Sequence, residues 1–331
     1  MREERRQRQV RLRDDEIYRD IQTVNQWTGQ RIWEYYVVKE LGNPIRKPLS
    51  FYHDAYKENT FTGRFYIWLK TLTPIFVGSG TVEITPSGNQ QYFTFARLGG
   101  KIVIPGSSLK GDVRQYAEAL SFSCYDGSCG GDDLCPACGI FGSREAHFLG
   151  RVAFEDAKLY KAPQKITRVI TIPQRWGPRI EYGNGRKFYY HAPPDIISGR
   201  DKEWLEVVEK ESYFIFLLSF ENLEGWELGL LILAMGLAPD WEFPLKVGGG
   251  KNRGLGLVKL ELIEGKSFLY PDPKQLCSSL SPQREVINQE MVRGWLNSYL
   301  EPLPTETKDK IKKIVEKFRE GKPDGKRKAN R

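Results

Sequence analysis

The stretch RFYIWLKTLT, residues 64–73, opens the part of the chain that defines the fold. Phe65, Ile67 and Leu69 lie at every second position, and aromatic residues occupy the positions between them. A period of two is the pattern of a β-strand, because successive side chains of a strand point to opposite faces of the sheet. We therefore predict a strand here and place the start of the main body near Phe61.

Further strands and helices follow this first strand in a regular order. Gly99-Gly100 is typical of a hairpin turn, and apolar residues at helical spacing follow Ser107 or Ser108, either of which could cap a helix. The patterns then predict a strand at 151–159, a strand at 213–220, a helix at 226–237 and a strand at 254–263. The order strand, helix, strand, strand, helix, strand predicts an α+β fold with a modified ferredoxin-like (RRM-like) βαββαβ core. This core supports many functions, so it does not decide this one.

Three regions are expected along the chain. Residues 1–60 form an extension, which we predict to be helical because apolar and aromatic residues recur at roughly helical spacing from Glu16 to Leu41. The core domain spans 61–265 and contains a cysteine-rich loop at 124–138 and a long irregular insertion at about 163–210. Residues 266–331 form a C-terminal helical segment and a basic tail.

Composition narrows the class of protein. The chain has 331 residues, of which 40% are hydrophobic, so it can bury a sizeable core. Lys and Arg number 50 against 42 Asp and Glu, a net charge of +8 that favours a polyanionic partner. No apolar run reaches the length of a membrane span, and the N-terminus lacks the apolar segment of a signal peptide. We therefore expect a soluble cytoplasmic protein.

Four of the five cysteines lie within fifteen positions, at Cys124, Cys129, Cys135 and Cys138. A Cys-x-x-Cys pair beside two more thiols provides the ligands of a closed tetrahedral zinc site, so we predict structural Zn²⁺. Such a loop has no core of its own and would depend on the metal to fold. The alternatives are reduced buried cysteines or a redox pair at Cys135 and Cys138, and His147 could replace Cys124 as the fourth ligand.

The stretch GGGKNRGLG, residues 248–256, does not fit a nucleotide-binding loop. It follows a predicted helix and opens a strand, and its spacing differs from that of a P-loop. Gly248, Gly249 and Gly250 leave backbone amides accessible, and Lys251 and Arg253 stand beside them. We expect this loop to contact the phosphates of an extended phosphodiester chain. The alternative is a tight turn with solvated charges.

The stretch IPGSSLKGDVR, residues 104–114, places small residues at the start of a helix. The free amides at a helix N-terminus attract anions, so Ser107 and Ser108 mark a second candidate phosphate contact. Lys110 and Arg114 are four residues apart and share a helix face. Gly111 is unfavourable inside a helix and indicates close approach by another group. An ordinary capped helix is the alternative.

Together with CPACGIFGS (135–143), GRVAFEDA (150–157) and the opening LTPIFVGSG (72–80), these motifs resemble the RAMP superfamily of CRISPR-associated proteins. More narrowly, residues 61–265 resemble the backbone subunits of type III RNA-guided effector complexes. The resemblance implies a modified RNA-recognition fold whose copies stack along a CRISPR guide RNA, with complementary target RNA and other RAMP subunits as partners. It maps the glycine loop and the helix start onto guide-RNA contacts.

The insertion at about 163–210 corresponds, through this resemblance, to a thumb that kinks the guide–target duplex. Its own chemistry fits that expectation, because cations neutralise phosphate and aromatic rings stack on bases. The candidate RNA contacts here are Arg168, Arg175, Trp176 and Arg179, and further cations and rings follow at Arg186, Lys187 and Tyr189. A surface hairpin with a small aromatic core is the alternative.

Cleaving members of the family carry an Asp in the loop after the first core strand. The corresponding stretch here, residues 78–91, has no Asp, and Glu83 is its only acid. Glu can bind Mg²⁺, but its side chain is one methylene longer. We therefore expect a guide-RNA-binding subunit that cleaves RNA weakly or not at all. The alternatives are a metal-dependent endoribonuclease that cuts target RNA at regular intervals and a zinc-stabilised adaptor without RNA contact.

Overall fold

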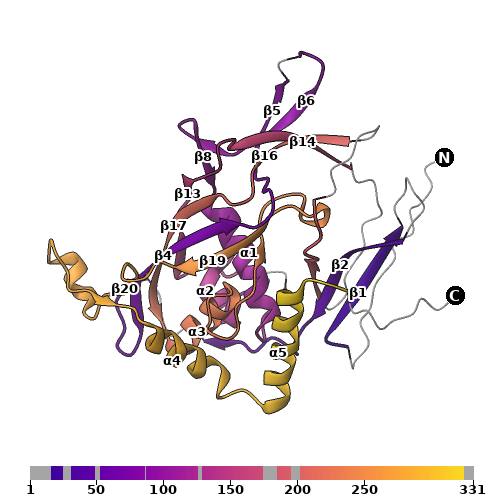
Figure 1. Ribbon diagram of the computed structural model, residues 1–331. Helices are drawn as coiled ribbons and strands as arrows, with labels where there is room; N and C mark the ends of the chain where they lie inside the picture. Colours follow the sequence, from indigo (N-terminus) through magenta and orange to yellow (C-terminus); the bar gives the residue numbers. More distant parts are fainter. Residues whose placement is uncertain are drawn as a thin grey trace.

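The computed structural model describes residues 16–24, 31–48, 53–85, 87–125, 129–173, 185–194 and 202–323. It has a mixed α+β fold, as expected, and is built around a curled sheet of ten strands (Figure 1). The strands along this sheet are β18 (Leu245–Lys246), β19 (Leu257–Leu262), β4 (Phe61–Thr71), β17 (Tyr213–Leu223), β13 (Ala157–Lys161), β8 (Lys101–Ile104) and β7 (Arg97–Leu98). Short strands β12 (Val152–Phe154), β20 (Phe268–Leu269) and β21 (Glu285–Val286) extend it.

The centre of this sheet contains the strands predicted from the sequence. β4 pairs antiparallel with β17 on one side and with β19 on the other, and β13 pairs antiparallel with β17. Helix α1 (Gly106–Ala119) and helix α3 (Gly225–Ala234) separate these strands in the chain. Phe65, Ile67 and Leu69 are fully buried, as their spacing in β4 predicts. Along the chain, α1 lies between β4 and β13 and α3 lies between β17 and β19, with shorter strands between them.

Helices cover one side of the large sheet (Figure 1). Helix α3 packs between α1 and α4 (Gln289–Leu300), and the contact with α4 is close. A Cβ atom added at Gly229 of α3 would lie only 2.1 Å from the carbonyl oxygen of Trp295 in α4. The predicted C-terminal helix is present as α5 (Thr305–Glu320), whereas α4 was not predicted. No helix among the described residues is long and apolar enough to span a membrane.

The described part of the N-terminal extension is not helical, which corrects the prediction. Residues Tyr18–Val24 and Arg31–Lys39 form strands β1 and β2, and β2 also pairs with β15 (Gly185–Tyr189). Residues 32–38 are rich in β-branched and aromatic side chains, which favour strands. The four consecutive residues 35–38 are all buried, so both faces of β2 are covered and the chain shows no clear period of two.

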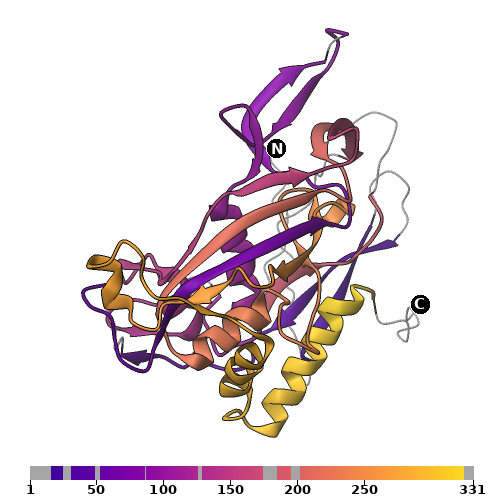
Figure 2. The ribbon, with the colours of Figure 1, turned by 60° about the vertical axis from the view of Figure 1, so that its left-hand side comes forward.

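The described part of the insertion is more regular than expected. β14 (Thr167–Pro173) and β16 (Lys202–Val208) pair with each other, and β16 runs parallel to β6 (Gln91–Phe95). β5 (Gly78–Ile84) completes this four-stranded sheet and forms with β6 a hairpin that stands away from the body (Figure 2). Short pairs are β3 (Lys47–Pro48) with β9 (Asp133–Leu134) and β10 (Gly142–Ser143) with β11 (Phe148–Leu149).

Candidate nucleic-acid interface and metal centre

Four cysteine sulfurs meet in the interior between the end of α1 and the short helix α2 (Pro136–Phe141). Cys124 and Cys129 come from the loop after α1, Cys135 is the N-cap residue of α2, and Cys138 lies in its first turn. All four side chains are buried, and all four sulfurs lie within 4.8 Å of one another. The sequence prediction that these cysteines come together is confirmed.

The distances between the sulfurs fit a single metal ion. Cys124 Sγ lies 3.6 Å from Cys135 Sγ, 3.5 Å from Cys138 Sγ and 3.8 Å from Cys129 Sγ. Metal–sulfur bonds of about 2.3 Å in a tetrahedral site place the sulfurs about 3.8 Å apart, whereas a disulfide needs about 2 Å. The four cysteines therefore form a site that could bind a metal ion such as zinc. His147 is exposed and does not belong to the described cluster.

Hydrogen-bond donors surround these sulfurs. Arg46 Nε donates to Cys129 Sγ at 3.4 Å, and this bond raises the pKa of Arg46. Arg114 Nη2 donates to Cys138 Sγ at 3.2 Å, and the backbone N–H of Cys135 donates to Cys129 Sγ at 3.4 Å. Positive donors around sulfur stabilise thiolates, which are the form that binds metal. The surroundings of the cluster thus match the chemistry of a tetrathiolate site.

Arg114 has a different place from the one expected. Besides Cys138, its Nε donates to Glu118 at 2.8 Å and its Nη1 donates to the carbonyl oxygen of Gly142 at 2.8 Å. These bonds direct the guanidinium group into the protein, between α1 and the cysteine loop. Arg114 therefore connects the cysteine loop with α1, and its expected phosphate contact stays a prediction.

The start of α1 is already paired within the chain. Its N-cap is Pro105, and no side chain caps the helix, so neither Ser107 nor Ser108 has the expected capping role. The first helical N–H, that of Gly106, donates to the Asp156 carboxylate at 2.9 Å. A carboxylate of the chain itself therefore accepts the first N–H of the helix, where an anion is favoured. Lys110 is half-buried, and burial with the nearby charge of Arg114 lowers its pKa.

The glycine loop folds back onto α1 and onto the segment that follows β4. The N–H of Gly248 donates to Asp112 at 3.4 Å, and the N–H of Gly249 donates to the carbonyl oxygen of Phe76 at 2.8 Å. Gly248 has a φ of +84°, and a Cβ there would lie 2.2 Å from the Phe76 oxygen, so only glycine fits this approach. Two of the three amides expected to face phosphate are therefore engaged within the chain.

The two cations of this loop lie in different environments. Lys251 forms an ion pair with the nearly buried Asp112, whose pKa is nevertheless raised because burial outweighs the attraction of Lys251. Arg253 is buried at the end of the short 3₁₀ helix Lys251–Arg253. Lys251 lines the pocket beside the loop, whereas Arg253 is buried, and its expected phosphate contact stays a prediction.

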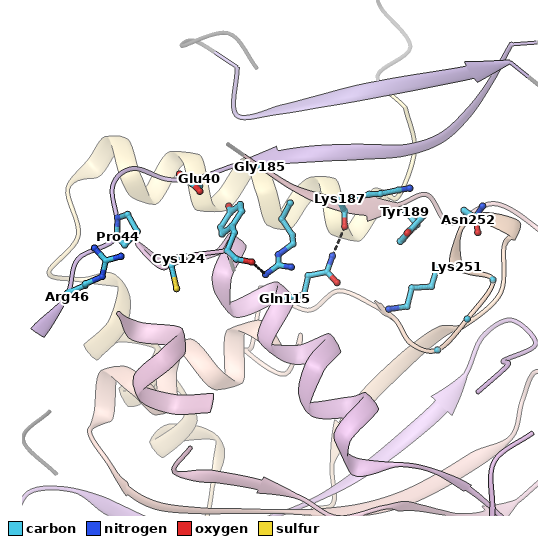
Figure 3. Close-up of a pocket in the computed structure, with 15 residues that line it drawn as sticks. Glu40, Pro44, Arg46, Gln115, Cys124, Gly185, Lys187, Tyr189, Lys251 and Asn252 are labelled. Carbon is cyan, nitrogen blue, oxygen red and sulfur yellow. Dashed lines mark hydrogen bonds between the residues drawn. The ribbon is translucent and has the colours of Figure 1, made fainter. Parts of the chain in front are cut away.

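A pocket of about 800 Å³ lies where the glycine loop, α1, β15 and the cysteine loop meet (Figure 3). Gln115 of α1 donates to the backbone oxygen of Lys187 at 2.5 Å across this pocket (Figure 3). Four basic residues and one acidic residue line the walls. The lining residues are Glu40, Pro44, Arg46, Gln115, Cys124, Tyr125, Gly185, Arg186, Lys187, Tyr189, Gly248, Gly249, Gly250, Lys251 and Asn252. Gly248, Gly249, Gly250 and Lys251 are thus brought to one surface with residues of the insertion.

The basic residues of β15 are packed against aromatic rings. Lys187 Nζ lies 3.9 Å from the ring centroid of Tyr35 and 5.0 Å from that of Tyr189. The Arg186 guanidinium lies 5.4 Å from the ring centroid of Tyr125, and burial together with Arg114 lowers its pKa to about 10. These contacts hold cations and rings side by side on one wall of the pocket.

Of the other expected contacts of the insertion, Arg168 lies in the described part of the chain. Arg168 lies on β14, where it pairs with Glu209, and it does not line the pocket. Arg175, Trp176 and Arg179 lie outside the described residues. Glu40, Arg46 and Gln115 were not identified from the sequence. Arg186 and Lys187 could be found there because cations alternate with aromatic residues around them.

The sequence of this chain matches the model of a known protein family. The model of the RAMP superfamily matches residues 68–259, which is more than half of the chain. The chain belongs to the RAMP superfamily. Members of this superfamily are generally RNA-binding proteins that work in multi-subunit complexes, and membership is consistent with CRISPR-associated RNA binding. No curated protein matches this chain. The match includes the end of β4, all of α1, the cysteine cluster and the glycine loop of this RAMP protein.

Glu83 lies on the exposed strand β5 and accepts a hydrogen bond from the Tyr92 hydroxyl at 2.7 Å. Catalytic magnesium is held by carboxylates together with other oxygen ligands. Among the described residues, the four cysteines are the only group of His, Cys, Asp or Glu side chains arranged to hold a metal ion. The described structure therefore gives no support for Mg²⁺ at Glu83.

Proposed function

We propose that this RAMP protein is a guide-RNA-binding backbone subunit of a type III CRISPR effector complex, with a role in antiviral defence. The observation that carries the proposal is the pocket where the glycine loop, α1 and the insertion strand β15 meet, three elements that lie within the family match. Its four basic residues and single acidic residue favour a polyanion. Tyrosine rings also line the pocket. An enzyme site that binds only a small anionic substrate would not require such rings.

The chemistry of the walls fits a ribose-phosphate chain. Arg46, Arg186, Lys187 and Lys251 would neutralise phosphates, as lysine and arginine do in most nucleic-acid interfaces. Tyr125 and Tyr189 would stack on bases, a contact that tolerates any sequence. Backbone contacts and stacking together suit a subunit that binds a guide RNA regardless of its sequence.

The arrangement of strands supports the finer interpretation of the fold. The core strands lie side by side in the order β19, β4, β17 and β13, which is fourth, first, third and second along the core. With α1 and α3 between them, this is the arrangement expected of a ferredoxin-like RNA-recognition core. Zn²⁺ bound by the four cysteines would fix the loop whose residues Cys124 and Tyr125 line the pocket.

Binding to single-stranded RNA tests the proposal. We expect the affinity to fall steeply with salt and to depend little on sequence. The double variant Arg186→Ala, Lys187→Ala should bind more weakly and reduce the slope of log affinity against log salt by about two, roughly one for each lost phosphate contact. Lys259→Ala is a matched control, because this exposed lysine of β19 does not line the pocket. Equal affinity of both variants would contradict the proposal.

An assembly experiment tests whether the chain is a subunit of such an effector complex. The chain, mixed with guide RNA and other RAMP subunits, should enter one particle that sediments together. The Arg186→Ala, Lys187→Ala variant should enter it poorly, because its contact with the guide is weakened. A chain that binds RNA but never joins other RAMP subunits would limit the function to RNA binding alone.

A further inference from the structure

A continuous series of ion pairs and hydrogen bonds connects the cysteine cluster with the wall of the pocket. Arg114 Nη2 donates to Cys138 Sγ at 3.2 Å, and Arg114 Nε donates to Glu118 Oε1 at 2.8 Å. The other carboxylate oxygen of Glu118 pairs with Arg186, which lines the pocket. Each residue of this series is therefore held by the one before it.

A second connection holds Arg186 from the other side. Its Nη2 donates at 2.5 Å to the backbone oxygen of Tyr125, the residue that follows Cys124. The Tyr125 ring lies under the same guanidinium group. Arg186 is thus held by Glu118 and by the cysteine loop itself, and both supports connect to the cysteine cluster, one through Arg114 and the other through Cys124.

The burial of these side chains strengthens the interactions between their charges. Glu118 is only 1% exposed, whereas the Arg186 side chain is 29% exposed toward the pocket. One carboxylate serves two guanidinium groups, so the three side chains carry one positive charge in excess. Charges inside a protein interact more strongly than in water, and an anion that reaches Arg186 would complete the pairing.

We propose that Arg186 binds an RNA phosphate and that metal bound by the four cysteines positions it through Arg114 and Glu118, so that metal and RNA each increase affinity for the other. This inference rests on the proposed RNA-binding function. A bound metal fixes Cys138 and gives Arg114 a stationary anionic partner. Arg114 then holds Glu118, and Glu118 holds Arg186 at the wall. Without the metal the sulfurs are no longer fixed, and Arg186 loses both supports.

Linkage provides the first test, because a coupling between two ligands is reciprocal. The metal affinity of the purified chain is measured by competition with a chromogenic chelator, with and without saturating single-stranded oligouridylate. We expect the RNA to raise metal affinity by about fivefold or more, within the usual range of such couplings. Arg186→Ala should bind the metal but show no increase. Arg97→Ala is the control, because Arg97 pairs with Glu206 outside the pocket and should keep the increase.

The results separate this inference from the proposed function. A chain that does not bind oligouridylate contradicts both. A chain that binds oligouridylate with unchanged metal affinity contradicts only the coupling, as does an increase that persists in Arg186→Ala.

A double-mutant cycle on the metal-loaded chain provides the second test. Glu118→Gln and Arg186→Ala should each lower the affinity for oligouridylate about tenfold, and the double variant should be no weaker than either, because both act through one contact. Additive losses would overturn the proposal. Glu118→Gln leaves two partly buried guanidinium groups without their carboxylate. The same cycle is therefore repeated with Arg114→Lys, which keeps the charge but not the three-way geometry.

Discussion

The Lys317 ammonium group in α5 lies 2.8 Å from the Asp20 carboxylate in β1, although the two side chains are only 1% and 11% exposed. The rings of Tyr18, Tyr36 and Tyr190 surround it, with centroids 4.7, 5.5 and 5.8 Å away. The Tyr190 hydroxyl donates to the same Asp20 oxygen at 2.6 Å. One buried ion pair therefore joins the sheet β1–β2–β15, which forms one side of the pocket, to the C-terminal helix.

Removal of one partner of this pair should destabilise the protein. We expect Lys317→Met to lower the free energy of unfolding by about 3–5 kcal/mol, because the variant leaves Asp20 buried without its counter-charge. The double variant Asp20→Asn, Lys317→Met should recover part of this loss, since no charge then remains buried. Urea unfolding followed by circular dichroism measures both. A double variant that is less stable than Lys317→Met would show that the charge of Asp20 is not the cause.

Loss of the metal should unfold the cysteine loop. We expect the purified chain to contain about one zinc ion, and we expect Cys135→Ser to lose it, because a tetrahedral site with one thiolate fewer binds zinc more weakly. Chelation should likewise lower the melting temperature. Cys277→Ser is the control, because this cysteine lies far from the other four in the sequence. Elemental analysis and thermal melting test this, and a metal-free native chain would refute the site.

Two glycines in neighbouring helices should respond in opposite ways to the same substitution. Gly229→Ala in α3 should destabilise the chain by about 2 kcal/mol or more, because the added methyl would overlap the Trp295 carbonyl group of α4. Gly294→Ala in α4 should stabilise it by about 0.5–1 kcal/mol, because this glycine is exposed and nothing in the described chain lies near the added atom. Chemical unfolding measures both, and equal effects would contradict the close contact.

The sequence predicted the parts of this molecule whose signals are local. The alternation around Phe65 and the apolar spacing in α1 reflect burial within one strand or helix, so the central elements could be predicted. The four cysteines lie within fifteen positions, so their meeting at one site could be predicted as well. The spacing of Arg114 and Glu118 on α1 is also visible in the sequence.

What the sequence did not reveal depends on contacts between distant segments. β2 has a partner, β15, about 150 positions later, and burial on both faces hid its period of two. Arg114 meets Cys138, and Lys251 meets Asp112, only after folding. Predictions based on charge alone therefore assigned some cations to phosphate contacts, although these cations have partners inside the protein.

Stability should depend on pH through Lys246. Its amine is buried and donates to the Leu255 carbonyl oxygen at 3.1 Å, and burial together with nearby Lys251 lowers its pKa to about 7. In the unfolded chain this lysine has a pKa of about 10.4. Between pH 7 and about 10 the unfolded chain therefore binds more protons at this group than the folded chain does, so the free energy of unfolding rises with pH. Lys246→Met should therefore raise stability by about 2–4 kcal/mol at pH 7, and the gain should shrink toward pH 10. A gain that does not vary with pH would show that Lys246 is charged in the folded state.

A substitution at Gly111 tests whether this glycine of α1 allows another group to approach closely. In the sequence it indicated close approach by another group, yet Gly111 is exposed, does not line the pocket, and has no described atom within 4 Å of an added Cβ. We therefore expect Gly111→Ala to raise the free energy of unfolding by about 0.5–1 kcal/mol, because alanine favours a helix. Its affinity for single-stranded RNA should equal that of the unaltered chain, measured by fluorescence anisotropy. A stable variant with clearly weaker binding would place the RNA along this face of α1 and move the interface from the pocket toward Lys110.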